Sequence, residues 1–273
     1  MRLPLDHIVI AVQDLERTIA DYQTLGFNVL RGGEHPGRST HNALVVFADG
    51  VYFELIAWRA PAPEERWWQQ LQQHGEGLVD FALLPTETGT AVAEAQARGL
   101  SYEAPYEGGR LRPDGAQLRW RNARARSQDL PFLCGDLTPR ALRVPEGQAR
   151  VHPNGVTGVA RLEVAVRDLQ ASLARWRALL GEGVDVGPLQ ASADGRSERV
   201  SLRLGSTELV LAAPLQAAGE LAQRLDTRGE GPYAVVLSVP RQESARKLDE
   251  AATHRVRLEL ARPSGIEVET AAA

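Results

Sequence analysis

A short, largely apolar segment near the start of the sequence recurs in altered form later in the chain. Residues 6–15 read Asp-His-Ile-Val-Ile-Ala-Val-Gln-Asp-Leu, and residues 160–169 read Ala-Arg-Leu-Glu-Val-Ala-Val-Arg-Asp-Leu. Each copy is a strand pattern that leads into apolar residues at helical spacing, and a glycine follows each helix pattern. The recurrence predicts a duplicated chain, in which His7 of the first copy has become Arg161 in the second.

Four stretches of this strand-then-helix kind organise the sequence. They cover residues 6–26, 77–99, 158–181 and 231 to about 254. Shorter alternating stretches follow each of them, separated by turn residues such as Asp49-Gly50. In the last stretch we expect a helix near residues 243–252, and then strands at 257–261 and 266–269. The pattern predicts an α+β chain of four βαβββ modules.

Residues 135–155 interrupt this pattern, because they are rich in Pro, Gly and Arg and show no clear periodicity. Such a stretch is typical of a linker between domains. We therefore predict two domains. Residues 1–145 would hold the first two modules, and residues 146–273 the last two.

The composition narrows the class of protein. With 43% hydrophobic and 24% charged residues, the 273-residue chain resembles soluble globular proteins. No apolar run approaches the ~18 residues of a membrane-spanning helix, and the first strand starts too early for a signal peptide, so we expect a cytoplasmic protein without a membrane partner. A formal net charge of -4 argues against nucleic acid. A small molecule is the expected partner, for a monomer or homodimer.

The alternation of side chains along a strand predicts that two candidate functional residues face away from the helix-covered core. Ile8 faces a helix-covered core, so His7 faces the opposite side. Phe53 and Leu55 share one face of a later strand, which leaves Glu54 on the other. A carboxylate among apolar residues needs a partner. His7 can supply it directly, through an ion pair or hydrogen bond, or the two can share a divalent cation.

Short motifs in the first module carry a family resemblance. Residues 6–9 read Asp-His-Ile-Val, residues 32–37 Gly-Gly-Glu-His-Pro-Gly, residues 40–44 Thr-His-Asn-Ala-Leu, and residues 52–56 Tyr-Phe-Glu-Leu-Ile. With these motifs the chain resembles the vicinal oxygen chelate superfamily, which includes glyoxalase I, extradiol dioxygenases and bleomycin resistance proteins, and more narrowly its glyoxalase-like branch. The resemblance implies that the modules pair into two curved, barrel-like mixed sheets with helices on the outside, around a cleft that usually holds a divalent metal.

The resemblance also implies metal ligands. In metal-dependent members, ligands lie on the first and last strands of each paired module, and His7 and Glu54 match these positions in module one. In module two, Asp80 stands where a second histidine is common, and the last strand offers no carboxylate. A set of His7, Glu54 and Asp80 suits Mg, Mn or Fe better than a closed structural Zn centre. Alternatively, Asp80 lies at a strand edge or pairs with an arginine.

The loop at residues 32–42, between the expected strands at residues 27–30 and 42–48, supplies further candidates. By the same resemblance, His35 or His41 would act as acid or base near neutral pH. The remaining polar residues of this loop and of the Glu54 strand would bind substrate; they are Arg38, Thr40, Asn42 and Tyr52.

A hairpin of module two is rich in arginine, and its strand parity leaves two arrangements open. If Leu118 and Trp120 face the core, Arg119 and Arg121 face the cleft and can hold a carboxylate or phosphate. With the opposite parity, Trp120 lies in the cleft and both arginines face solvent.

Three functions follow from these features. The first is a metal-dependent lyase or isomerase of the glyoxalase-like class, acting on a small substrate with vicinal oxygens, which would be anionic if cleft arginines bind it. An extradiol-type dioxygenase is less favoured, since such enzymes usually present two histidines and one carboxylate. The alternative class is a metal-free binding protein of the bleomycin-resistance type. We expect one active cleft, in residues 1–145, because Arg161 stands in place of the histidine in the second half.

Overall fold

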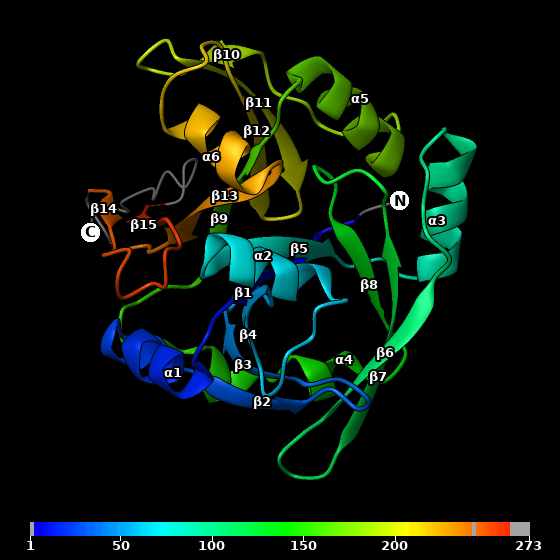
Figure 1. Ribbon diagram of the computed structural model, residues 1–273, viewed down its shortest axis with the longest axis vertical. Coiled ribbons are helices and arrows are strands. Elements are labelled where there is room, and N and C mark those ends of the chain that lie inside the picture. Colours follow the sequence, from blue (N-terminus) through cyan, green and yellow to red (C-terminus); the bar gives the residue numbers. More distant parts are fainter. Residues whose placement is uncertain (1–2, 242–243, 263–273) are drawn as a thin grey trace, which may run out of the picture.

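Two curved sheets form the framework of the protein (Figure 1). The computed structural model describes residues 3–241 and 244–262. The first sheet is a closed barrel, in which each strand pairs with the next in the order β1 (Leu5–Ala11), β4 (Tyr52–Trp58), β3 (Thr40–Val46), β2 (Leu30–Glu34), β6 (Tyr106–Leu111), β7 (Gln117–Arg124), β8 (Phe132–Asp136) and β5 (Gly77–Leu83).

The second sheet has seven strands and does not close within the described residues. Their order is β10 (Gln190–Ala191), β11 (Ser197–Leu204), β12 (Thr207–Pro214), β9 (Gly158–Ala165), β13 (Gly231–Ser238), β15 (Leu258–Ala261) and β14 (Arg246–Lys247). The two sheets share a strand pairing: β1 pairs with β4 in parallel in the first sheet, and β9 pairs with β12 in parallel in the second. The predicted α+β fold with two curved, barrel-like mixed sheets is confirmed.

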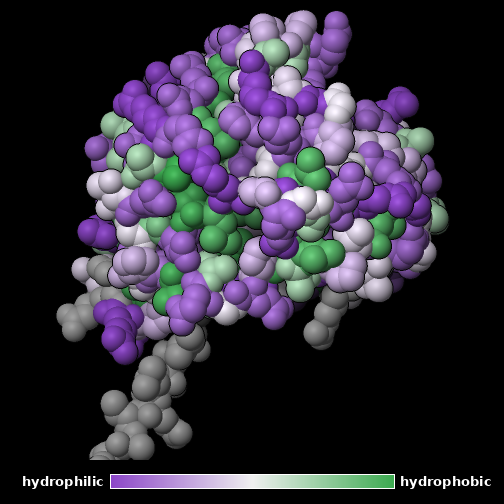
Figure 2. Space-filling model, turned by 90° about the horizontal axis from the view of Figure 1, so that it is seen from below, coloured by the Kyte–Doolittle hydropathy of each residue, from purple (hydrophilic) through white to green (hydrophobic). Residues whose placement is uncertain are grey.

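Helices cover the sheets from outside (Figure 1). Asp14 and Asp168 begin the two corresponding helices in the same way, since each carboxylate accepts a hydrogen bond from a backbone N–H three residues later. The helices are α1 (Leu15–Thr24), α2 (Arg66–His74), α3 (Thr88–Ala97), α4 (Arg140–Arg143), α5 (Leu169–Leu180) and α6 (Glu220–Arg228), with a 3-10 turn at Gly147–Arg150. Polar residues cover much of the face seen from below (Figure 2).

The alternation predicted for the first strand is confirmed. Ile8 and Ile10 pack in the main core between sheets and helices, whereas Val9 and Ala11 pack inside the barrel. The main core is continuous across both sheets. Trp176 of α5 is fully buried and stacks on Phe81 of β5, so an aromatic pair joins the second half of the chain to the barrel.

The helix predicted near residues 243–252 is wrong. The described part of this segment holds the short strand β14 and then a series of turns, and His254 and Arg255 have positive φ angles. Tertiary contacts explain the difference, because His254 lies between Asp21 of α1 and Glu76, at 3.1 and 2.9 Å from their carboxylate oxygens. A regular helix would not bend the chain toward these partners. The strand predicted at residues 266–269 lies outside the described residues.

The segment predicted as a linker contains α4 and the 3-10 turn, and the boundary at residues 145 and 146 falls between them. That domain division stays a prediction. Among the described residues, no helix is long and apolar enough to span a membrane.

Replacing Trp176 by alanine should lower the free energy of unfolding by about 3–5 kcal/mol, because the change leaves a cavity beside Phe81. Urea denaturation measures the effect. The exposed neighbour Arg177 provides the control, and Arg177→Ala should change stability by less than about 0.5 kcal/mol. If both variants unfold alike, the aromatic pair does not join the two halves.

Candidate active site

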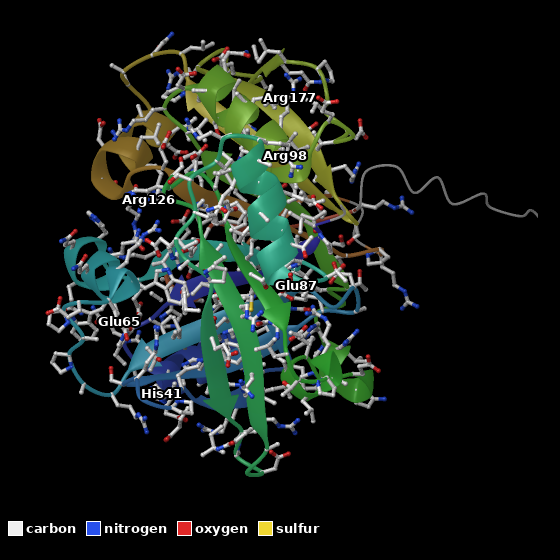
Figure 3. The ribbon with its side chains drawn as sticks, turned by 90° about the vertical axis from the view of Figure 1, so that its right-hand side faces the viewer. His41, Glu65, Glu87, Arg98, Arg126 and Arg177 are labelled. Carbon is white, nitrogen blue, oxygen red and sulfur yellow. The ribbon has the colours of Figure 1, made fainter. Side chains whose placement is uncertain are left out.

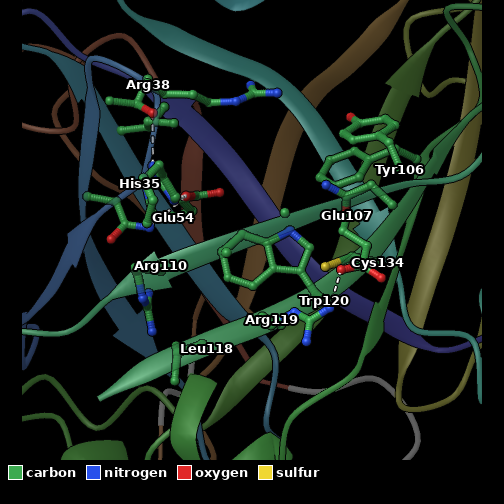
Figure 4. Close-up of a pocket in the computed structure, with 18 of the residues that line it drawn as sticks. His35, Arg38, Glu54, Tyr106, Glu107, Arg110, Leu118, Arg119, Trp120 and Cys134 are labelled. Atoms are coloured by element: carbon green, nitrogen blue, oxygen red, sulfur yellow. Dashed lines mark hydrogen bonds and ion pairs between the residues drawn. The ribbon is translucent and has the colours of Figure 1, made fainter. Parts of the chain in front are cut away.

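A cavity of about 580 Å³ opens inside the closed barrel. Aromatic side chains, Trp67, Trp120 and Phe132, form much of its apolar wall. Trp120 crosses the middle of the cavity in Figure 4, between the His35–Glu54 side and Tyr106. The space for its indole depends on Gly108, because a Cβ at that position would lie 2.4 Å from Trp120 Nε1.

His7 projects from β1 into this cavity with a fixed ring orientation. Its Nδ1 lies 2.7 Å from Asp6 Oδ2. Because the Asp6 carboxylate accepts only, Nδ1 carries the proton and Nε2 presents its lone pair to the cavity. Nε2 lies 3.6 Å from Glu54 Oε2, which is too long for a hydrogen bond. The ring stacks on Tyr52 with centroids 4.7 Å apart.

Glu54 of β4 lies between two imidazoles. While His7 approaches one of its oxygens, His35 Nε2 lies 3.7 Å from the other, Oε1. Asn42 of β3 donates a hydrogen bond of 2.7 Å to the same Oε1. The sequence therefore folds so that two histidines 28 positions apart flank one buried carboxylate.

His35 stands at the start of a tight hairpin between β2 and β3. Its backbone N–H donates to Thr40 O at 3.1 Å, and its Nδ1 forms a 2.9 Å hydrogen bond with Thr40 Oγ1. Burial lowers the pKa of His35, although Glu54 acts in the opposite direction. The imidazole is therefore neutral near pH 7, with Nε2 directed toward Glu54.

A buried ion-pair network supports His7 from behind. Arg143 of α4 donates to Asp6 Oδ2 at 2.7 Å, to Asp136 Oδ1 at 2.5 Å and to Tyr52 Oη at 2.7 Å. Burial opposes ionisation of Asp6, but Arg143, His7 and Arg140 outweigh it and hold the pKa of Asp6 below its usual range. The sequence motifs contain Asp6 and Tyr52 but give no sign of this network, because their partner Arg143 lies in the segment without periodicity.

The structure does not bring Asp80 to His7 and Glu54. Its carboxylate accepts hydrogen bonds from Arg124 Nη1 at 2.5 Å and from Trp67 Nε1 at 2.9 Å, and it lies outside the cavity lining. Burial would raise the pKa of Asp80, but Arg124 and Arg66 lower it overall. This is the arginine pairing that the sequence left open for Asp80.

The other predicted site residues divide by strand parity. Those that line the cavity are Arg38, which is exposed, and the buried residues Thr40, Asn42 and Tyr52. His41 alternates with them and lies on the outer side, near the edge of the molecule in Figure 3. Partial burial and Arg59 lower its pKa.

The arginine-rich hairpin adopts the second of its two predicted arrangements. Trp120 lies in the cavity, and the side chains of Arg119 and Arg121 are 62% and 38% exposed and pair with Glu107. Arg119 is one of the residues that line the cavity, and Arg121 is not.

Comparison with known proteins identifies the family. Residues 5–180 match the sequence model of the Glyoxalase-like domain. The chain belongs to the glyoxalase-like family. The predicted membership of the vicinal oxygen chelate superfamily is thereby confirmed. No curated protein sequence matches significantly.

Solved structures share the fold of this glyoxalase-like protein at low sequence identity. A hypothetical protein from Staphylococcus aureus is 14% identical with a TM-score of 0.73, and the match covers 95% of this chain and 99% of that one. A mutant 4-hydroxymandelate synthase from Streptomyces coelicolor is 16% identical with a TM-score of 0.62, covering 88% and 72%. A xylose isomerase-like TIM barrel/4-hydroxyphenylpyruvate dioxygenase fusion protein is 14% identical with a TM-score of 0.53, covering 86% and 36%. At these identities the likeness concerns the fold alone.

Two groups of side chains in this glyoxalase-like barrel offer metal ligands. Asp6, His7 and Cys134 place ligand atoms within 4.8 Å of one another. However, Asp6 is already bound to arginines, and burial raises the pKa of Cys134, which disfavours the thiolate that a metal needs. The other group is His7 with Glu54. The atoms that face each other, His7 Nε2 and Glu54 Oε2, are not bound to arginines in this way.

Replacing Asp80 by asparagine should lower the free energy of unfolding by about 3 kcal/mol, since Arg124 would lose its buried anionic partner. Because the folded-state pKa of Asp80 is lowered, its stabilisation is present above the unfolded pKa of about 3.9 and is lost as pH falls further. Urea titrations at pH 7 and about pH 3 should therefore give a smaller difference between wild type and variant at the lower pH.

The control is Glu107→Gln, which removes the carboxylate of a surface pair and should unfold like the wild type. An equal effect of both variants would contradict the buried role of Asp80.

Proposed function

We propose that the barrel cavity is the active site of a metal-dependent enzyme of lyase or isomerase type, acting on a small substrate with vicinal oxygens. The observation that carries the proposal is the Nε2 of His7, which has no hydrogen bond within the described residues and lies 3.6 Å from Glu54 Oε2. Asp6 holds the ring in this orientation through Nδ1. A buried imidazole that is oriented by a carboxylate and lacks a partner on its other nitrogen is the usual arrangement of a metal-binding histidine.

The chemistry of these donors fits a divalent cation. One imidazole nitrogen and one carboxylate suit Mn, Fe, Zn or Mg when water and substrate oxygens complete the coordination. His7 and Glu54 would hold the ion. Asp80 is not a ligand in this scheme, because its carboxylate is paired with Arg124. A bound cation would polarise vicinal oxygens of the substrate.

The protein's own residues have separate tasks in this scheme. Asp6 keeps the His7 proton on Nδ1, and Asn42 fixes one oxygen of Glu54 by its hydrogen bond. His35, which Thr40 orients, is placed to accept or return a substrate proton at Nε2. The aromatic wall, which includes Trp120, restricts water around the reacting groups.

A metal-free binding protein is the second candidate. The observation that favours it is the composition of the other half of the barrel, where Ala82 lies opposite His7 in β5 and Phe132 and Cys134 come from β8. These side chains make an apolar pocket with His7 and Glu54 as a polar pair. An extradiol-type dioxygenase would need His35 as a second imidazole ligand beside His7 and Glu54.

Metal binding tests the proposal directly. Purified protein incubated in turn with Mn, Fe, Zn and Mg should bind about one ion per chain, as measured by inductively coupled plasma mass spectrometry. His7→Ala and Glu54→Gln should each reduce affinity at least about ten-fold, because each removes a ligand. Asp80→Asn should bind metal as the wild type does.

His35→Gln separates the roles of the second imidazole. Retained metal supports a proton-transfer role, whereas lost metal makes His35 a ligand and favours the dioxygenase type. If the wild type binds none of the four metals stoichiometrically, the enzyme proposal fails and the metal-free binding protein replaces it.

A further inference from the structure

Arg110 of β6 differs from every other arginine of the cavity lining. The lining contains six arginines, and within the described residues the other five each have a carboxylate oxygen within 4.0 Å of the guanidinium; they are Arg38, Arg66, Arg119, Arg124 and Arg143. Arg110 has none there, and yet it is only 3% exposed. It is a buried cation without an anion.

The hydrogen bonds of Arg110 are also incomplete. Its Nη2 donates to the backbone carbonyl of Arg143 at 3.1 Å, while its Nε is buried without a partner. Nη1 lies over Gly32, where a Cβ would come within 2.9 Å of it. The same absent Cβ leaves room for Asn42 Oδ1, another buried atom without a partner in the described residues. Polar groups without partners therefore gather on this side of the cavity.

Such a guanidinium costs free energy unless an anion binds to it. A buried charge needs a counter-charge and hydrogen bonds to offset its lost hydration. Burial lowers the pKa of Arg110, and Tyr52 and Glu54 oppose this effect only in part. Arg110 also acts electrostatically on His35, so it lies close to the groups of the proposed active site.

Support of α4 alone does not require a buried arginine. Arg112, two residues further along, donates to the carbonyl of Leu142 at 3.2 Å from outside the cavity, and its charge is paired with Asp114 at 2.7 Å. The same helix is thus held from an accessible position with its charge balanced. The burial of Arg110 inside the cavity is better explained by a ligand.

We propose that Arg110 is the receptor for the carboxylate of a small organic acid, whose apolar body lies against Trp120 and Phe132. The single positive charge matches one carboxylate, and a guanidinium provides the donors that such a group accepts. This substrate class rests on the proposed function for the chemistry at His7 and Glu54, but the anion site itself requires no metal. Arg119 and Arg121, which Glu107 engages, are not the anion receptors.

Matched acids and amides test this proposal. The probes are formate, acetate, benzoate and phenylacetate, each beside its primary amide, and isothermal titration calorimetry measures their affinity for chelator-treated wild type. At least one acid should bind ten-fold or more tightly than its amide. Arg110→Gln should remove that preference, whereas Arg112→Gln, the matched control, should keep it. If no acid is preferred over its amide, or if Arg110→Gln keeps the preference, the proposal is overturned.

The stability of Arg110→Met provides a second test, because a ligand-binding role and a purely structural role of Arg110 predict opposite changes in it. Because the variant removes an unpaired buried charge, its midpoint of urea denaturation should equal or exceed that of the wild type. A lower midpoint with unchanged acid binding would assign Arg110 to the support of α4 and overturn the proposal. If the protein binds the acid but no stoichiometric metal, the anion site is supported and the metal-dependent enzyme is not. If it binds metal but does not prefer the acid over its amide, the metal site is supported and the anion site is overturned.

Discussion

The buried contact between Asp6 and Arg143 is the constraint on which the cavity depends. Burying two charges is costly unless the geometry is good and the remaining donors and acceptors are satisfied. Here Asp6 accepts from His7, Arg140 and Arg143, and Arg143 also reaches Asp136 and Tyr52. The network ties the first strand of the barrel to the short helix that follows its last strand, and it simultaneously fixes the tautomer of His7.

The same principle separates structural charges from charges that remain for a ligand. Asp80 and Arg124 neutralise each other at one side of the barrel interior, and the exposed arginines of the β6–β7 hairpin pair with Glu107. Among the buried polar atoms that lack a partner within the described residues, Arg110 Nε and Asn42 Oδ1 belong to side chains that line the cavity beside Glu54. Chemistry is expected where a folded chain leaves such groups unsatisfied in a buried, water-poor space.

Regular periodicity explains which parts of this arrangement could be predicted. The strand period of two places His7 and Glu54 inside the barrel as soon as Ile8 and Phe53 are assigned to the core. It also limits the arginine hairpin to two arrangements, without deciding between them. That decision depends on Gly108, whose missing side chain admits Trp120, and a sequence pattern does not reveal which glycine faces which indole.

Contacts between distant segments account for what the sequence could not predict. Arg143 comes from a stretch without periodicity, and Asp80 meets its partner 44 residues later, in a strand whose register is set by the closed barrel. His254 likewise directs its segment toward α1 in place of the predicted helix. In each case a polar side chain finds its partner only in the folded protein, so local propensity carries no signal of it.

The comparison of His7 with Arg161 shows how the two sheets can share a framework and differ in chemistry. At the corresponding position of β9, Arg161 donates to Glu208 at 2.9 Å and lies 3.8 Å from Glu163. That charge is neutralised within its own sheet, whereas the Nε2 of His7 faces Glu54 without bonding to it. A strand-and-helix frame therefore does not by itself produce a site. The difference lies in whether the side chain at this position already has partners among its neighbours, and it is the reason for proposing the active site in the barrel.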